Sequence, residues 1–381
     1  MKNQFVILTG SKNNAGDYLI KLRAKQLFAN LRPDREIIDI NGWETLTEEN
    51  LKIVNDSRAL ILMGGPALVE NMLPNVYGIS DALDKIKVPI IMMGLGWKSV
   101  QGNWENTYSY KLSPITNKLV QLVSNSGFLS SVRDYHTLNS LRFNNCDSVL
   151  MTGCPAYYDE QFIGTDFNAK PVEKVAFSLG VSFVESPSME KLMKENILAC
   201  RSKFADKSFE VVFHHSLDRE KFKGAYQPAS THVKKHHLFV DWLEANKIKY
   251  VDISGSAENL MNYYSQVDLH IGYRVHAHIF MNSTARQTIL ISEDGRAKGV
   301  KGAIGGIVLN GYSHFKNGFI SKVFNRLFSF YDRFSSNIYL TKELLAEIDY
   351  EEKTEFSRMK NSRKTIDSNY LIMQQFLKQL P

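Results

Sequence analysis

Short runs of consecutive apolar residues alternate along the chain with stretches in which apolar residues recur every three or four positions. The segments 4–10 ("QFVILTG"), 58–65 ("RALILMGG") and 88–96 ("VPIIMMGLG") are runs of the first kind, and 17–30 is a stretch of the second kind. Strands that are apolar at successive positions are typical of a sheet buried on both faces. The alternation therefore predicts βαβ units around a parallel sheet.

This alternation is present in both halves of the chain and is interrupted once, by the polar stretch 164–174. We therefore predict an α/β protein with two tandem doubly wound, Rossmann-like domains, residues 1–165 and 166–340. Residues 341–381 are charged and then periodic, which predicts a C-terminal helical tail. The further strands that we expect are 35–40, 127–134, 147–153, 174–180, 209–215, 249–254, 267–273 and 287–292.

Composition narrows the class of protein. With 381 residues, 44% of them hydrophobic and 23% charged, the chain has ordinary globular values and enough length for two or three domains. Its three cysteines show no C-x-x-C spacing, so neither a zinc site nor a redox motif is favoured, and a reducing cytoplasm fits best. We expect a cytoplasmic protein, because no window has the apolar length of a signal peptide or a membrane helix.

The net charge of +6 is a mild basic bias. It fits a soluble protein, an anionic small substrate or an anionic membrane face. We expect no nucleic-acid partner, because zinc-finger, RNP and basic-arm patterns are absent from the sequence. The stretch 321–336 ("SKVFNRLFSFYDRFSS") has aromatic residues at helical spacing with basic residues among them. It predicts either a helix buried against its own domain or a peripheral contact with the inner face of the membrane.

Glycine-bearing loops follow the first strands. In parallel α/β sheets, ligands bind outside the carboxyl ends of the strands. Asn14, Gly16 and Asp17 lie where the first helix begins, and the segment is either an anion site with close backbone approach or an ordinary N-cap. Gly64 and Gly65 follow the third expected strand, either as a backbone cradle for a ligand or as a tight turn.

Charged and imidazole side chains follow the later strands. Arg133 stands where a strand becomes a helix, and its guanidinium either pairs locally with Asp134 or enters the cleft to bind a carboxylate or phosphate. His214 and His215 follow another strand, and adjacent strand residues point to opposite faces, so at most one of them can face a given site. No third ligand at the usual spacing supports a zinc ion there.

The segment 270–302 places cations between apolar runs. Two consecutive strand–helix loops carry these side chains at neighbouring strand ends, so we predict that they line an anion-binding cleft. The residues concerned are Arg274, His276, Asp294, Arg296 and Lys298.

Taken in order, these motifs resemble the polysaccharide pyruvyl transferases. The resemblance spans residues 13–299 and rests on "NNAGDYLI", "GG" after the third strand, "GLGW", "SVRDYHTLNSL", "GCPAYY" and "GYRVHAHIFMNSTARQTILISEDGRAKG". The family is similar in fold to two-domain glycosyltransferases of the GT-B type, with the active site in the interdomain cleft. This chain has Cys154-Pro155 where the family often carries Asp-Pro, and Pro66 where a third glycine is usual, two departures that bear on the choice of substrate.

The resemblance implies a reaction. Family members transfer the enolpyruvyl-derived group of phosphoenolpyruvate to two sugar hydroxyls and form a pyruvate ketal, in the biosynthesis of cell-surface polysaccharides. The partners implied are phosphoenolpyruvate as co-substrate and a glycan or lipid-linked saccharide as acceptor, with no metal and no resident cofactor. Matching positions assign Arg274 and His276 to the phosphoenolpyruvate site, and Arg133 and Arg296 are expected as further anion contacts.

The implied chemistry needs an acid and a base. Protonation of the methylene carbon requires a general acid, for which His276 is the natural candidate because imidazole titrates near neutral pH. Asp17 is the expected base for the sugar hydroxyl, and His214 is the second candidate for this role.

Two other functions fit the same residues. A GT-B-type glycosyltransferase with a nucleotide-sugar donor would use the arginines to hold a diphosphate. A non-catalytic sugar-phosphate binding protein of a polysaccharide assembly complex would bind donor or acceptor and consume neither. The acceptor sugar, the ketal stereochemistry and the oligomeric state are left open.

Overall fold

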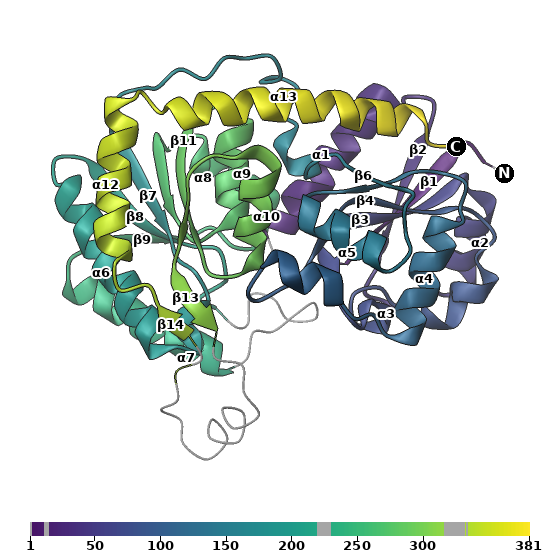
Figure 1. The fold of residues 1–381 in the computed structure, drawn as a ribbon, viewed down its shortest axis with the longest axis horizontal. Helices are drawn as coiled ribbons and strands as arrows, with labels where there is room; N and C mark the ends of the chain where they lie inside the picture. The colour runs from purple at the N-terminus through teal and green to yellow at the C-terminus, as the bar shows by residue number, and fades with distance from the viewer. Residues whose placement is uncertain (1, 11–14, 219–229, 316–331, 333) are drawn as a thin grey trace.

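Two parallel sheets of six strands each, joined by a helical C-terminal segment, make up the computed structural model of the protein (Figure 1). This confirms the predicted α/β fold with two tandem doubly wound units. The structure describes residues 2–10, 15–218, 230–315, 332 and 334–381.

Two expectations fall outside the described residues. Asn14 is one of them, and most of the basic aromatic stretch 321–336 is the other. The substrate contact and the membrane-surface helix therefore stay predictions. Within the described part of the chain, every helix is too short or too polar to cross a bilayer.

The first sheet has the strand order β2-β1-β3-β4-β5-β6. Strands β1 and β4 are buried along their whole length, as their unbroken apolar runs predict. The chain leaves β1 for β2 on one side and then takes up β3 on the other, so the switch point of this sheet lies between β1 and β3. The strands are β1 (Gln4–Thr9), β2 (Glu36–Asn41), β3 (Ala59–Leu68), β4 (Ile90–Trp97), β5 (Ser130–Val132) and β6 (Val149–Met151).

The second sheet has the order β12-β11-β10-β7-β8-β9, and its switch point lies between β7 and β10. The boundary that we place between residues 165 and 166 falls in the connection between the two sheets; as a statement about separate domains it stays a prediction. The strands are β7 (Lys174–Ser178), β8 (Ser208–Phe213), β9 (Lys249–Asp252), β10 (Leu269–Gly272), β11 (Gln287–Ser292) and β12 (Val308–Asn310).

Helices follow most strands and cover both sheets (Figure 1). Several begin at a side chain that accepts a bond from a free N–H of the first turn, as Ser113 does for Thr116 and Ser186 for Met189. The helices are α1 (Ala15–Leu31), α2 (Glu48–Asp56), α3 (Met72–Asn75), α4 (Pro114–Ser124), α5 (Tyr135–Phe143), α6 (Pro187–Lys203), α7 (Ser230–Ala245), α8 (Ala257–Tyr264), α9 (Val275–Ser283), α10 (Gly295–Ile304), α12 (Leu340–Lys353) and α13 (Ser357–Lys378).

The structure corrects the sequence prediction at several points. Strand β3 continues to Leu68, so Gly64 and Gly65, which were expected to follow it, lie inside it. Between β3 and β4, residues Ser80–Lys85 form a short 3₁₀ helix. Strand β12 and the antiparallel pair β13 (Tyr312–Phe315) and β14 (Phe334–Ser336) were not predicted.

The C-terminal helix α13 runs along both units and ends beside the first sheet (Figure 1). At that end, Arg32 donates hydrogen bonds from Nη1 to the carbonyls of Leu377 (3.1 Å) and Leu380 (2.9 Å). The larger of the two buried apolar clusters contains residues of both sheets and of α13, such as Phe5, Val212 and Ile366. The tail therefore helps to hold the two units together.

Arg363 of α13 is buried at the junction of the two units. Its Nη1 donates to the carbonyl of Asn282 at the end of α9 (3.2 Å), and its Nη2 donates to the carbonyl of Phe162 in the connecting segment (2.8 Å) and to Asp367 (2.6 Å). A cation at the C-terminus of a helix is also favoured by the helix dipole.

Replacing Arg363 by Met should lower the free energy of unfolding by about 2–4 kcal/mol, because buried carbonyl groups lose their donors. Urea denaturation measures this. The matched control is Lys360→Met at a partly exposed position of α13, where Lys360 forms a surface ion pair with Glu355; it should change the free energy of unfolding by about 0.5 kcal/mol or less. Equal stabilities of the two variants would contradict the role assigned to Arg363.

Candidate functional site

The two switch points face each other, and they meet at Gly16 and His276. Gly16 lies in the first turn of α1, after β1, and His276 lies in the first turn of α9, after β10. A Cβ atom at Gly16 would lie 1.8 Å from Nδ1 of His276. Only glycine fits there, so this residue is required for the approach of the imidazole ring across the interdomain boundary.

Asp17 lies next to this contact and is buried, with 7% of its surface exposed. Gly65 has φ of +122°, and a Cβ atom there would lie 3.1 Å from Oδ1 of Asp17. Gly64 instead packs against the neighbouring strand, because a Cβ atom there would lie 2.3 Å from the carbonyl oxygen of Gly94. The structure thus brings Gly65 to the site beside Asp17 and places Gly64 inside the sheet.

Arg133 follows β5 directly and is 5% exposed. Its Nε lies 3.4 Å from Asp134, whose side chain caps α5 by accepting from the backbone N–H of Thr137 (2.8 Å). Gly96 leaves room for the guanidinium, since a Cβ atom there would lie 2.0 Å from Nε. Both terminal nitrogens, Nη1 and Nη2, are buried without a hydrogen-bond partner among the described residues. Buried donors of this kind are costly unless a ligand accepts from them.

The imidazole of His276 is also incompletely satisfied. Its Nε2 is buried and has no hydrogen-bond partner in the part of the chain that the structure describes. Burial, together with the positive charges of Arg133, Arg296 and Arg274, lowers the pKa of His276 to about 3. Without a ligand, His276 is therefore neutral at pH 7.

Arg274 bridges the second switch point. It precedes α9, and its Nε donates to the carbonyl of Leu179 after β7 (2.6 Å). Its backbone N–H donates to Oγ of Ser178 (3.0 Å). Burial lowers the pKa of Arg274 to about 10, against the opposing effect of Glu293, so the guanidinium stays charged at neutral pH.

Arg296 and Asp294 form an ion pair at the start of α10. The Asp294 carboxylate caps the helix through the backbone N–H of Arg296 (2.9 Å) and accepts from its Nε (2.8 Å) and Nη2 (2.6 Å). Burial would raise the pKa of Asp294, but the Arg296 guanidinium outweighs it and lowers that pKa, and Asp294 in turn raises the pKa of Arg296. Arg296 thus lies near the site with its charge paired.

Glu293 is a site residue that the sequence analysis missed. Its Oε2 accepts from the backbone N–H groups of Val181 (2.7 Å) and Ser182 (3.0 Å), which holds the loop after β7. Its Oε1 is buried without a hydrogen-bond partner among the described residues. The sequence does carry one signal for Glu293, an acidic residue directly after the apolar run that forms β11.

Lys298 connects the two units. Its Nζ donates to the carbonyl of Gln101 (2.7 Å) and to Oδ1 of Asn103 (2.9 Å), both in the first unit. We call residues 99–101 the strap, because all three carbonyls accept from the second unit. The other two bonds come from the backbone N–H of Gly295 to Ser99 (2.9 Å) and from the hydroxyl of Tyr312 to Val100 (2.5 Å).

His214 lies after β8 and is 3% exposed. Its Nε2 is hydrogen-bonded to the hydroxyl of Tyr264 (2.7 Å). Burial and the charge of Arg274 hold the pKa of His214 well below its usual range. The same two causes lower the pKa of His215. Because β8 ends at Phe213, the opposite-face rule for strand residues does not apply to this pair.

The charges of the site are largely balanced. Each of the three arginines has a carboxylate partner or neighbour, so the positive charges of the site are compensated. The groups left for a ligand are the ends of Arg133 and Nε2 of His276, with Asp17 beside them. Among the described residues, no cluster of three or more His, Cys, Asp or Glu side chains is arranged to hold a metal ion.

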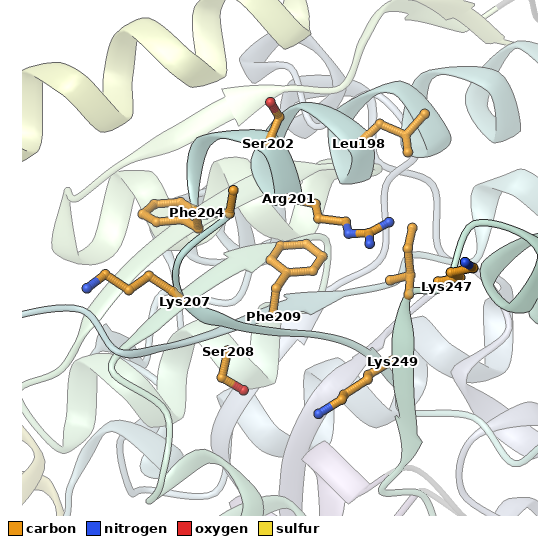
Figure 2. Close-up of a pocket in the computed structure, with 11 residues that line it drawn as sticks. Leu198, Arg201, Ser202, Phe204, Lys207, Ser208, Phe209, Lys247 and Lys249 are labelled. Carbon is orange, nitrogen blue, oxygen red and sulfur yellow. The ribbon is translucent and has the colours of Figure 1, made fainter.

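Two pockets lie away from these residues. One, of about 510 Å³, is lined by the end of α6 and the starts of β8 and β9, including Arg201, Lys247 and Lys249 (Figure 2). It lies at the opposite end of the sheet from His214, because β8 runs from the pocket to the site. The other, of about 470 Å³, is formed by the loops after β3 and β4, and the strap is one of its walls.

Solved structures with the same fold include complexes with UDP-GlcNAc and with UDP. UDP-GlcNAc 2-epimerase from Neisseria meningitidis, bound to UDP-GlcNAc, has a TM-score of 0.54 at 11% identity, over 98% of this chain and 100% of that one. MnaA of S. aureus, in a co-structure with UDP, has a TM-score of 0.55 at 10% identity, over 98% and 95%. These similarities show the fold alone, which is of the GT-B type.

The family is shown by the sequence comparison. None of the curated proteins compared matches this chain. The family model described as polysaccharide pyruvyl transferase matches residues 14–295, well over half of the chain. The matched region contains Gly16, Asp17, Arg133, Arg274 and His276, all of which lie in loops or helix starts that follow strands of the two sheets. The chain therefore belongs to the polysaccharide pyruvyl transferase family.

Proposed function

We propose that the protein is a pyruvyl transferase that binds phosphoenolpyruvate between the two switch points and transfers its three-carbon unit to hydroxyl groups of a saccharide. The observation that carries this proposal is that the terminal nitrogens of Arg133 and Nε2 of His276 are all buried without a hydrogen-bond partner among the described residues, and that the charge of Arg133 acts on His276. Together they offer a planar fork for a carboxylate or phosphate and a titratable nitrogen next to it.

Phosphoenolpyruvate carries close to three negative charges at neutral pH. A site whose fixed charges are nearly balanced accepts such an anion when donors are already in place, because no arginine has to give up a buried partner. Arg133 supplies those donors, and Arg274 stays charged beside them. The first turn of α9 has no side-chain cap, so its backbone N–H groups add a favourable dipole.

His276 acts as the acid only once the donor is bound. Protonation of the methylene carbon creates a cationic centre at the neighbouring carbon, which a first sugar hydroxyl attacks with loss of its proton. Phosphate then leaves, and a second hydroxyl of the acceptor attacks the same carbon, loses its proton and closes the ketal. A neutral His276 has no extra proton to give, but the bound anion offsets the arginine charges that lower its pKa. Asp17, adjacent to the glycine that contacts the His276 ring, is the proposed base for the attacking hydroxyl.

The acceptor saccharide enters from the pocket behind the strap. That pocket has Glu70, Lys98 and Lys111 among its lining residues, a mixed polar surface suited to hydroxyl groups. Its strap wall is bonded to Gly295 and Lys298 of α10, the helix that also carries Arg296, and these bonds connect the pocket to the second unit.

Thermal shift with single ligands tests the donor. Phosphoenolpyruvate at about 100 times its dissociation constant should add about 2.7 kcal/mol of stability. UDP, CMP and GDP are the comparison, because the GT-B fold also serves nucleotide-sugar enzymes. Stabilisation by a nucleotide and none by phosphoenolpyruvate would reject the proposed donor. Release of phosphate with a panel of saccharides then separates transfer from binding alone.

Arg133→Lys keeps the charge but loses the fork, and it should weaken phosphoenolpyruvate binding about 10-fold or more. The concentration dependence of the thermal shift measures this. Arg142→Lys, on the exposed face of α5, is the matched control and should bind as the wild type does. Unchanged binding by Arg133→Lys would remove Arg133 from the donor site.

Binding of phosphoenolpyruvate should raise the pKa of His276 from about 3 towards neutrality, so the complex takes up protons near pH 6–7 and less at higher pH. Titration calorimetry in buffers of different ionisation enthalpy measures the uptake. His276→Gln should abolish the proton uptake that this residue contributes on binding, and it should slow turnover by about 100-fold. His237→Gln, at an exposed position of α7, should leave both unchanged. Equal uptake by the wild type and His276→Gln would exclude His276 as the acid.

A further inference from the structure

An exposed tryptophan of the first unit lies on a column of aromatic rings. Trp104 begins the short 3₁₀ helix η2 (Trp104–Ser109) and is 47% exposed. Its indole stacks on the ring of His136, with 4.1 Å between the ring centroids and 19° between the planes. His136 stacks in turn on Trp97 (5.4 Å, 10°), which is fully buried and also contacts the ring of Tyr110 (5.5 Å).

This column covers one face of the Trp104 indole and leaves the other face to solvent. A ring that is covered completely on one face keeps about half of its surface, so an exposure of 47% means that little covers the opposite face. Indole rings are common at binding surfaces, because they combine a large apolar face with one polar N–H group. We call the exposed face of the Trp104 ring the platform.

Hydrogen bonds hold η2, and with it the platform, in place. Oγ1 of Thr107 donates to the carbonyl of Trp104 (2.6 Å) and accepts from Nδ2 of Asn139 on α5 (2.6 Å). Nζ of Lys298 donates to Oδ1 of Asn103, the residue before η2 (2.9 Å). A ring that is already held in one orientation loses little conformational freedom when a ligand packs on it, which favours binding.

The same short helix forms part of the pocket behind the strap. Residues three apart share one face of a 3₁₀ helix. Asn106 and Ser109 both line the pocket, whereas Trp104 and Thr107 both contact α5. The strap is another wall of the pocket, and Trp104 follows its last residue by three positions, a chain length of at most about 11 Å. Two linked sugar rings have a comparable length, so such a ligand reaches from the pocket to the platform.

The chemistry of the platform and of the pocket suits a sugar. The C–H groups on one side of a pyranose ring form an apolar face that packs on an indole, while the hydroxyl groups around the ring need polar partners. In the pocket lining, Oδ1 of Asn106 is buried without a hydrogen-bond partner among the described residues. A hydroxyl group of a ligand can donate to this atom.

The exposed charges of the pocket and of η2 cancel one another. Glu70 lines the pocket and Glu105 belongs to η2, while Lys98 and Lys111 also line the pocket, and all four residues are exposed. Two carboxylates and two ammonium groups leave no net charge to attract an anionic membrane surface. They do offer acceptors and donors to the hydroxyl groups of a neutral saccharide.

We propose that the ring of Trp104 binds a neutral sugar ring by stacking, and that the pocket behind the strap takes the hydroxyl groups of the next sugar. The ligand is therefore a saccharide of at least two rings. Trp104 sets the affinity for this ligand and takes no part in the chemical step. The binding of a saccharide stands on the geometry, whereas its identity as the acceptor rests on the proposed function.

Fluorine-19 spectra of the protein labelled with 5-fluorotryptophan test the binding without a donor. The chain has four tryptophans, and Trp104→Phe identifies the platform signal by its loss. The probes are lactose, cellobiose and N,N′-diacetylchitobiose, each titrated into the millimolar range, because stacking uses the apolar ring face that all of them have. At least one of them should shift the Trp104 signal to saturation, and none should shift the signals of Trp43 and Trp242. A Trp104 signal that moves with none of the three would overturn the proposal.

Vesicles of phosphatidylglycerol are the second probe. The balanced charges of the pocket and of η2 predict that the Trp104 signal stays unchanged when these vesicles are added. A shift with the vesicles and with none of the disaccharides would show a membrane contact in place of a saccharide site, and the proposal would be wrong.

Trp104→Ala and Trp104→Phe form a matched pair. Loss of the ring should raise the dissociation constant of the bound disaccharide about 10-fold or more, whereas Trp104→Phe keeps an aromatic face and should change it about threefold or less. Saturation-transfer spectra of the disaccharide measure both. The control is Tyr108→Ala, which removes a 60% exposed ring from the third face of η2 and should change this constant about twofold or less. Equal dissociation constants for Trp104→Ala and Tyr108→Ala would contradict the proposal.

Phosphoenolpyruvate separates this inference from the proposed function. It should stabilise Trp104→Ala as much as the wild type, and in the phosphate-release assay Trp104→Ala should raise the KM for the saccharide while kcat stays unchanged. Disaccharide binding at Trp104 without any response to phosphoenolpyruvate would reject the proposed donor and support the platform. A response to phosphoenolpyruvate with equal saccharide KM values for Trp104→Ala and the wild type would reject the platform and support the donor.

Discussion

The contact between Gly16 and the imidazole of His276 depends on the two units being held closely together. Gly16 has only a hydrogen atom where other residues have a Cβ atom, so the start of α1 lies directly against the His276 ring. The N-termini of α1 and α9 can lie this close together only if the two sheets keep one relative position. The strap, bonded at three successive carbonyls, and the helix α13 supply that position from different sides. The chemistry of the site is thus set by contacts that lie mostly outside it.

Much of the fold could be predicted because strands buried on both faces leave a signal that depends on each segment alone. The unbroken apolar runs of β1 and β4 are such signals. The short edge strand β12 lacks one, since its three residues become progressively more exposed. Gly64 and Gly65 misled the prediction because a glycine inside a strand and a glycine after it look the same in sequence. Their difference is set by Gly94 and Asp17, which are distant along the chain.

The sequence indicates which residues of the candidate site lie near one another, but not which partner each of them has. The residues that follow the strands do come together, because the carboxyl ends of parallel strands all lie on one edge of a sheet. The sequence does not show which of these side chains are already bonded to another protein group. Arg296 is paired with Asp294, and Lys298 is bound to the strap, whereas Arg133 keeps two free nitrogens among the described residues. Pairing depends on packing between units, which no local pattern encodes.

The two buried histidines of the site differ in what their nitrogens are bonded to. Nε2 of His276 has no hydrogen-bond partner among the described residues, and burial together with the charges of three arginines lowers the pKa of this histidine. A bound anion offsets those charges and can therefore raise that pKa. Nε2 of His214 is bonded to the Tyr264 hydroxyl, and burial together with the charge of Arg274 lowers the pKa of His214. In the proposed reaction, His276 therefore suits a group that changes its charge when the donor binds, whereas His214 suits a group that stays neutral and keeps its orientation.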